Sequence, residues 1–180
     1  MFVQTEVTPN PNSLKFLPGK NVSNIGSFEV TQKSDTDNEL VKNILSINGV
    51  TGVFLGVDFL SINKKEEAIW EDIKHIVISL INEFYATGKE FVITNELLKE
   101  KNEEHSEIEK KIISILETKI RPAVAKDGGD IKFNEFKDGV VKVELQGSCS
   151  GCPSSTMTLK QGVQNLLCHY LPEVKEVVAI

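Results

Sequence analysis

A β-hairpin signal near the C-terminal end of the chain constrains the fold more than any other feature. Asp138 and Gly139 separate two β-forming runs, residues 131–136 and 140–145. Asp-Gly is a strong signal for a two-residue turn between antiparallel strands, because both positions of that turn require positive φ. The second run leads directly into a loop that reads Gly-Ser-Cys-Ser-Gly-Cys-Pro-Ser-Ser, residues 147–155. The sequence therefore places this loop at one end of a hairpin.

The loop contains Cys149 and Cys152 and leads into a predicted helix. Pro153 suits the first helical position, because it has no N–H and its φ is already near the helical value. The apolar residues that follow predict a helix from Pro153 to about Tyr170. Cys152 then lies at or near the N-cap, where unpaired N–H groups and the helix dipole favour a thiolate. We expect both cysteines to be more reactive than average.

The Cys-x-x-Cys pair is compatible with several kinds of chemistry. Two thiols at this spacing can bind one metal centre together or form a disulfide, so iron–sulfur ligation, a dithiol redox switch and zinc binding are all candidates. Packing as two small hydrophobic residues is the structural alternative. A 4Fe-4S cluster or a structural zinc usually takes four protein ligands, whereas this loop supplies two. Any further ligands must come from elsewhere.

The only other cysteine is Cys168, which is followed by His169. Adjacent helical residues point about 100° apart, which disfavours joint ligation by these two side chains. Cys168 also lies about fifteen residues along the predicted helix, roughly 20 Å from the loop. We expect Cys168 to pack in the core. The remaining source of ligands is a second chain, and we infer a cluster held by Cys149 and Cys152 of two copies.

Charge and composition exclude several functional classes. The net charge is −6, with 12 acidic and 8 basic residues in 1–93, 4 and 2 in 94–105, and 10 of each in 106–180. Arg121 is the only arginine, so the bidentate guanidinium contacts typical of phosphate and base recognition are nearly absent. Nucleic acid binding is therefore disfavoured. No apolar run approaches the length of a membrane span, so no membrane partner is expected.

The cysteine content and the N-terminal sequence bear on the compartment. Three cysteines, two of them in a reactive motif, fit a reducing compartment better than a secreted disulfide scaffold. The first residues lack the basic and apolar regions of a signal peptide, and they are not rich in arginine and serine. We expect a bacterial cytoplasmic protein, or a mitochondrial matrix protein in its processed form.

The pattern of apolar residues and turn signals predicts an α+β protein with two small α/β-sandwich-like domains, each a mixed sheet covered by helices. The first domain, residues 1–93, has the order ββαββα, with a short strand also allowed near residues 28–31. Its long helix is expected from about Glu67 to Ala86, with one apolar stripe of Ile69, Ile73, Ile76, Leu80 and Phe84.

A charged linker, residues 94–105, is followed by the second domain, residues 106–180, with the order αββαβ. Its first helix opens with a capping box of Ser106 and Glu109 and is expected to stop near Arg121 and Pro122. Residues 127–130, Asp-Gly-Gly-Asp, read as a turn before the hairpin.

A resemblance to a known family covers nearly the whole chain. The NifU-like C-terminal domain of the Nfu iron–sulfur proteins is closely similar to the segments RPAVAKDGGDIKF, GVVKVELQGSCSGCPSSTMTLKQGVQNLL and LPEVKEVVAI. The N-terminal domain that accompanies it resembles TEVTPNPNSLKFLPG and GVTGVFLGVDFLSI. These motifs are far more specific than a bare Cys-x-x-Cys pair.

The resemblance implies a scaffold or carrier, not an enzyme, that holds a 4Fe-4S cluster between two chains and transfers it to apo-proteins. Cys149 and Cys152 match the ligand positions of the family, and Cys168 matches none. The implied partners are a second copy, upstream iron–sulfur assembly proteins and apo client enzymes, with the first domain as a candidate for docking them. A dithiol redox protein and a zinc-stabilised interaction module are the alternatives.

Overall fold

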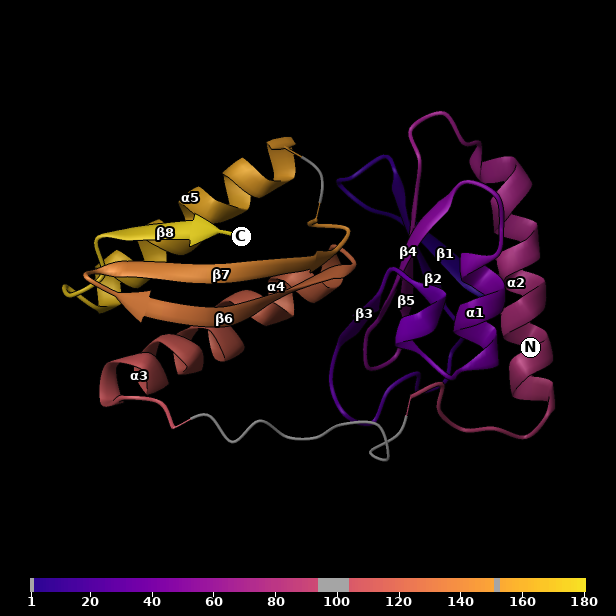
Figure 1. The fold of residues 1–180 in the computed structure, drawn as a ribbon, viewed down its shortest axis with the longest axis horizontal. Coiled ribbons are helices and arrows are strands. Elements are labelled where there is room, and N and C mark those ends of the chain that lie inside the picture. The colour runs from indigo at the N-terminus through magenta and orange to yellow at the C-terminus, as the bar shows by residue number, and fades with distance from the viewer. Residues whose placement is uncertain (1, 94–103, 151–152) are drawn as a thin grey trace. The chain divides into compact units, whose positions relative to one another are not determined.

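The computed structural model describes residues 2–93, 104–150 and 153–180 of the chain (Figure 1). The chain divides into two compact units, Met1–Leu98 and Lys99–Ile180, and each has its own hydrophobic core. Both units combine helices with a sheet, which confirms the α+β class. Most of the expected linker lies outside the described residues, so domain boundaries at 93 and 106 stay a prediction.

The first unit contains a five-stranded sheet. Its elements are β1 (Gln4–Val7), β2 (Ser13–Leu17), β3 (Phe28–Val30), the 3-10 turn η1 (Lys33–Asp35), α1 (Glu39–Leu45), β4 (Val50–Leu55), β5 (Leu60–Lys64) and α2 (Trp70–Ala86). The strand order is β1-β2-β5-β4-β3, and all four pairings between these strands are antiparallel. The expected mixed sheet is therefore wrong for this unit, and the short β1–β2 and β4–β5 connections, which permit only antiparallel pairing, account for two of its four strand pairs.

The element order of the first unit is βββαββα rather than ββαββα, because the allowed strand near residue 28 does form. Helix α2 begins three residues later than expected, since the chain at Ala68 still turns back to Lys65 (N···O 3.1 Å). The buried face of α2 also differs from the expected stripe. Ile69 and Ile76 are 57% and 47% exposed, whereas the core receives Ile73, Val77, Ile81, Phe84 and Tyr85.

The second unit is built on a three-stranded sheet. Its elements are α3 (Glu107–Ile115), the π-helical turn η3 (Leu116–Ile120), α4 (Arg121–Lys126), β6 (Gly129–Lys137), β7 (Val140–Gly147), α5 (Pro153–Tyr170) and β8 (Glu176–Ala179). β6 pairs antiparallel with β7, and β7 pairs parallel with β8, so the expected mixed sheet is confirmed here. At the tip of the hairpin Asp138 and Gly139 have φ of 54° and 84°, as the Asp-Gly signal predicts.

The expected helix end near Arg121 and Pro122 is wrong, because helical structure continues to Lys126. The π-helical turn interrupts the regular hydrogen bonding immediately before the proline. Pro122 then stands in the first turn of α4, where its missing N–H loses no helical hydrogen bond. The helix therefore runs past the proline and carries the chain to the start of β6.

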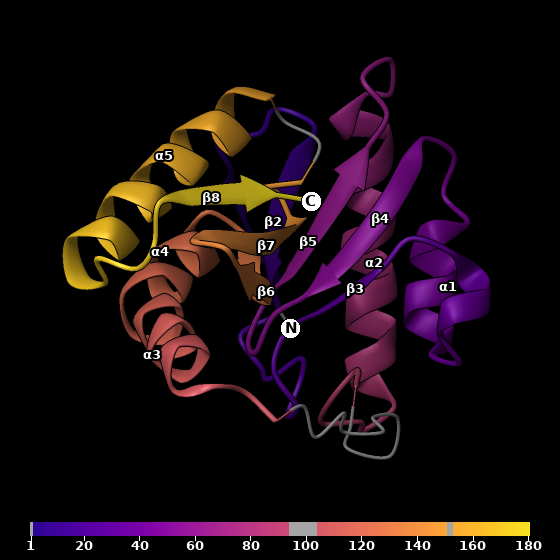
Figure 2. The ribbon, with the colours of Figure 1, turned by 60° about the vertical axis from the view of Figure 1, so that its left-hand side comes forward.

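In each unit the helices cover one face of the sheet (Figure 2). In the second unit the shared core takes Val141, Val143 and Leu145 from alternate positions of β7, Ile112 from α3, and Val163 and Leu167 from α5. Within the described residues, no helix is both long and apolar enough to cross a lipid bilayer. The cysteine loop starts where β7 leaves this core.

Candidate functional site: the cysteine loop

The described part of the cysteine loop turns sharply as it leaves β7. Gly147, the last residue of β7, has φ of 69°, a left-handed conformation that favours glycine. Its carbonyl oxygen accepts hydrogen bonds from the backbone N–H of Ser150 (3.2 Å) and from the Ser150 hydroxyl (2.9 Å). Cys149 lies inside this turn, carries a thiol rather than a disulfide, and is only 6% exposed.

Gly129 leaves the space that the Cys149 sulfur occupies. A Cβ atom at Gly129 would lie 2.8 Å from Cys149 Sγ and 2.6 Å from the Gln146 carbonyl oxygen. Both distances are shorter than nonbonded atoms tolerate, so a side chain at this position would displace either the sulfur or the backbone of β7. Gly129 is thus part of the site. The sulfur of Cys149 is also more enclosed than we expected for a reactive cysteine.

Ser148 ties the loop to the segment that precedes β6. Its backbone N–H donates to the Gly128 carbonyl oxygen at 3.2 Å, and its hydroxyl donates to the Asp127 carbonyl oxygen. Gly128 has φ of 82°, so the turn requires a residue with glycine's freedom at this position. The turn beside the site is therefore confirmed, but it is shorter than expected, because Gly129 and Asp130 already belong to β6.

Thr156 holds the loop from the helix side. Its hydroxyl donates to the Cys149 carbonyl oxygen at 3.2 Å, which links the backbone of the loop to the first turns of α5. Cys149 is consequently anchored by the end of β7, by the turn before β6 and by α5.

Arg121 and Asp130 form an ion pair across the same turn. Arg121 Nε and Nη2 each lie 2.9 Å from a different carboxylate oxygen of Asp130, which is the bidentate arrangement. Asp130 is 4% exposed and also accepts from the backbone N–H of Ile131 at 2.8 Å. The hydrogen bonds to Asp130 raise the pKa of Arg121 above its usual value. The pair joins the start of α4 to the start of β6.

Sequence reasoning gave Arg121 no role at the site and treated Asp130 only as a turn residue. The signal that was available is the position of the only arginine, nine residues before an aspartate in a glycine-rich turn. Gly129 was placed in the turn, but its contact with the sulfur joins segments twenty residues apart, which no local pattern reveals.

Of the two predicted ligands, the structure describes only Cys149. Cys152 lies outside the described residues, although α5 begins at Pro153 as predicted. Cys168 is partly buried near the other end of α5 and packs against the core, as expected. Its Sγ lies 3.2 Å from the Val174 carbonyl oxygen. Within the described ranges, no three His, Cys, Asp or Glu side chains gather as a metal site.

Two family models match the chain. The "NifU-like domain" matches residues 112–178, and "Scaffold protein Nfu/NifU N terminal" matches residues 3–88. Among curated proteins, "NifU-like protein 4, mitochondrial" of Arabidopsis thaliana is 43% identical over 98% of this chain and 65% of that protein. "NFU1 iron-sulfur cluster scaffold homolog, mitochondrial" of Homo sapiens is 42% identical over 98% of this chain and 71% of that protein.

A solved structure also aligns with part of the chain. The solution NMR structure of a NifU-like protein from Saccharomyces cerevisiae has a TM-score of 0.48 and 30% identity, and covers 53% of this chain and 87% of that one. The present chain spans 65% of the length of the Arabidopsis relative and 71% of the human one.

Proposed function

The chain belongs to the Nfu family of iron–sulfur cluster scaffold proteins, and from this we propose that it carries a 4Fe-4S cluster and transfers it to apo-proteins. In this proposal Cys149 and Cys152 of two copies bind the cluster. The observation that carries it is the position of Cys149, just after β7, where its sulfur fills the space beside Gly129 at the start of β6. Three elements hold the backbone around Cys149, which fixes the position of the thiol that this proposal assigns to the cluster.

The number of ligands supports the sharing of the cluster between two chains. A 4Fe-4S cluster is normally held by four thiolates, and each chain offers two in its Cys-x-x-Cys motif. Cys168 cannot readily act as a third, because it is engaged with the Val174 carbonyl near the far end of α5. A second copy then supplies the missing pair.

The same arrangement accounts for transfer. Four thiolates on a 4Fe-4S core of charge +2 leave a net charge of about −2, which helix N-termini and loop N–H groups offset in part. Transfer exchanges one ligand at a time: an iron–cysteine bond to the carrier breaks, and one to the acceptor forms. The proton of the acceptor thiol passes to the departing carrier thiolate, and no electron moves. We therefore assign a carrier rather than an enzyme.

The partners follow from this role. We propose that iron–sulfur assembly proteins load the cluster, that apo client enzymes receive it, and that the first unit docks these proteins. Both the Arabidopsis and the human relative are named mitochondrial, which supports the mitochondrial matrix as the compartment. The cytoplasm of a bacterium is the other compartment that the sequence allows.

Anaerobic reconstitution of the full chain tests the proposal. Mössbauer spectroscopy should report a 4Fe-4S cluster, and sizing should report a cluster-dependent dimer. Cys149→Ala and Cys152→Ala should each lose the cluster, whereas Cys168→Ala, the matched control, should keep it. Full cluster content in either loop variant would overturn the proposal. Stoichiometric zinc in the purified protein, or reversible dithiol cycling without iron, would favour one of the two alternatives instead.

A further inference from the structure

Between Thr156 and Asn165, the exposed positions of α5 carry no charged side chain. The 18 residues Pro153–Tyr170 include one lysine, one histidine and no acidic residue. Lys160, the lysine, points toward β8 and lies 3.9 Å from a carboxylate oxygen of Glu176. The exposed positions between Thr156 and Asn165 are Met157, Thr158, Gln161, Gly162 and Asn165, which we call the α5 outer face.

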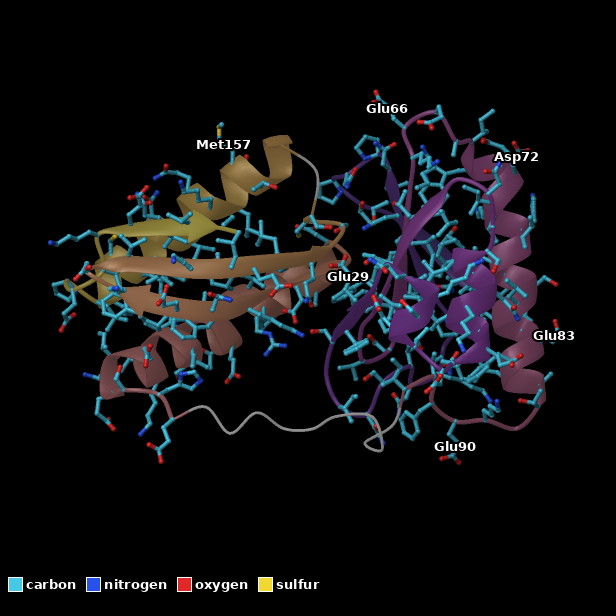
Figure 3. The ribbon with its side chains drawn as sticks, in the orientation of Figure 1. Glu29, Glu66, Asp72, Glu83, Glu90 and Met157 are labelled. Atoms are coloured by element: carbon cyan, nitrogen blue, oxygen red, sulfur yellow. The ribbon has the colours of Figure 1, made fainter. Side chains whose placement is uncertain are left out.

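These five residues form one continuous surface. Met157, Gln161 and Asn165 follow one another at intervals of four residues, and Gln161 Nε2 donates to Asn165 Oδ1 at 2.9 Å. Met157 is 73% exposed and points away from the helix (Figure 3). A Cβ at Gly162 would meet no atom within 4 Å, so the middle of the face is open. Val163 and Leu167 occupy the opposite side of α5, in the core.

Helix α2 of the first unit shows what a solvated helix of this length usually carries. It has 17 residues, and its exposed side includes Glu71 and Asp72. Figure 3 shows Asp72 and Glu83 directed away from this helix. Charged side chains on the exposed side are the ordinary pattern for an amphipathic surface helix. The α5 outer face departs from that pattern at the helix that follows the cysteine loop.

We propose that the α5 outer face contacts the same face of a second copy when a cluster is shared. The inference rests on the proposed function, because it takes the two cysteine loops to be joined by one cluster. Each loop leads directly into Pro153, the first residue of α5. Two loops held at one cluster therefore bring the first turns of two α5 helices close together.

Charge favours a second copy as the occupant. A two-fold contact places one surface against itself, so a charge near the two-fold axis lies close to its own copy and is repelled. The uncharged face avoids this repulsion. A different protein would be recognised and oriented more effectively by charged groups of complementary sign, which this face does not offer.

The α5 outer face is too small to hold two chains together unless they also share a cluster. Nine helical residues present on the order of 150 Å² per chain, whereas specific protein interfaces bury about 1,200 Å² or more in total. The contact is too small to hold two chains alone. It adds to the affinity only when the shared cluster already links them, so we expect monomers without the cluster and dimers with it.

Two double variants test the surface. Thr158→Glu with Asn165→Glu, and Thr158→Lys with Asn165→Lys, alter exposed positions seven residues apart and create no like-charged pair at helical spacing of three or four. Each double variant, reconstituted alone, should dissociate about tenfold more readily than the wild-type dimer in sedimentation. An equal mixture of the two should regain dimers of about wild-type stability, because opposite charges then face each other.

Single-charge controls are Ser114→Glu and Ser114→Lys on the exposed side of α3, which should leave the dimer unchanged. Recovery on mixing would separate a surface effect from misfolding, and failure to recover would overturn the proposal. Unchanged dimers in both double variants would contradict the proposed contact between α5 outer faces, but would not contradict the proposal that two chains share a cluster. Unchanged dimers with slower transfer to an apo-ferredoxin would assign the face to clients instead. A monomeric cluster-bound wild type would overturn the proposed function, and this inference with it.

Discussion

The two units use the same device, a glycine that makes room for a neighbouring side chain, for different ends. In the first unit, a Cβ on Gly56 would collide with the ring of Phe59, which packs against Phe54 with 5.9 Å between ring centroids. In the second unit, the space above Gly129 receives the sulfur of Cys149. The close approach serves packing in one unit and seats a candidate ligand in the other.

Ionic contacts differ between the units in a similar way. In the first unit, Lys42 and Asp37 lie 3.7 Å apart at the surface, with 41% and 94% of their side chains exposed. In the second, Arg121 grips a carboxylate of which 6% is exposed. A surface pair contributes little to stability, whereas a buried carboxylate depends on its partner. The second unit thus places its strongest ionic contact beside the candidate site.

Breaking the buried pair by removing one partner should have the largest effect on stability. Arg121→Met leaves the Asp130 carboxylate without its guanidinium, and we expect a loss of about 2–3 kcal/mol in unfolding free energy. Hydrogen exchange should localise the loss to β6 and β7. Lys42→Met in the first unit is the matched control and should change stability by less than about 0.5 kcal/mol. Equal effects would remove the contrast between the two pairs.

Filling the two glycine positions should separate packing from ligand seating. Gly129→Ala and Gly56→Ala should each cost about 1–3 kcal/mol, because both overfill a closed site. Only Gly129→Ala should also lower the iron content after reconstitution, since its Cβ displaces Cys149 Sγ. Gly162→Ala, where no atom lies nearby, should stabilise α5 by about 0.5–1 kcal/mol. Normal iron content in Gly129→Ala would show that the sulfur does not need this space.

Alkali should weaken the first unit through Tyr85. The hydroxyl donates to the Asn21 carbonyl oxygen at 2.7 Å, and burial raises the pKa of Tyr85 from 10.0 to about 12. Because the pKa of Tyr85 is higher in the folded state than in the unfolded state, the neutral side chain contributes fully to the unfolding free energy below pH 10. This contribution disappears as the pH rises toward 12. The loss should be on the order of 2 kcal/mol. Tyr85→Phe should flatten this dependence in pH-dependent denaturation, and an unchanged slope would contradict the assignment.

Acid should loosen the start of the second unit, with the smallest effect. Hydrogen bonds from Ser106 lower the pKa of Glu109. The Glu109 carboxylate therefore stabilises the folded state fully above pH 4.5, and this stabilisation disappears as the pH falls through the lowered pKa. Ser106→Ala removes the cap and should cost about 1 kcal/mol. Circular dichroism at neutral and acidic pH should show a smaller acid effect in Glu109→Gln than in the wild type, because the amide does not titrate, whereas Ser106→Ala keeps the backbone N–H that donates to Glu109 at 2.8 Å. The exposed Ser114→Ala in the same helix is the control.

Local sequence signals determined much of the second unit. The Asp138-Gly139 turn, the capping box at Ser106 and the start of α5 at Pro153 all formed where they were predicted. Each depends on the φ preferences or hydrogen-bonding groups of residues within a few positions of one another. For the same reason, the Cys-x-x-Cys motif after the hairpin was enough to predict the position of the cysteine loop, and with it the position of Cys149.

Tertiary structure decided the features that join distant segments. Helical periodicity predicted α2 but not which of its apolar residues face the sheet, because neighbouring stripes fit the same period. Helical structure passes Pro122 because of the π-helical turn before it, which no simple rule for proline predicts. The seating of Cys149 over Gly129 and the grip of Arg121 on Asp130 depend on how β6, β7 and α4 meet. Contacts of this kind arise from the packing of complete elements, so the sequence could name the cysteine but not the surroundings that hold it.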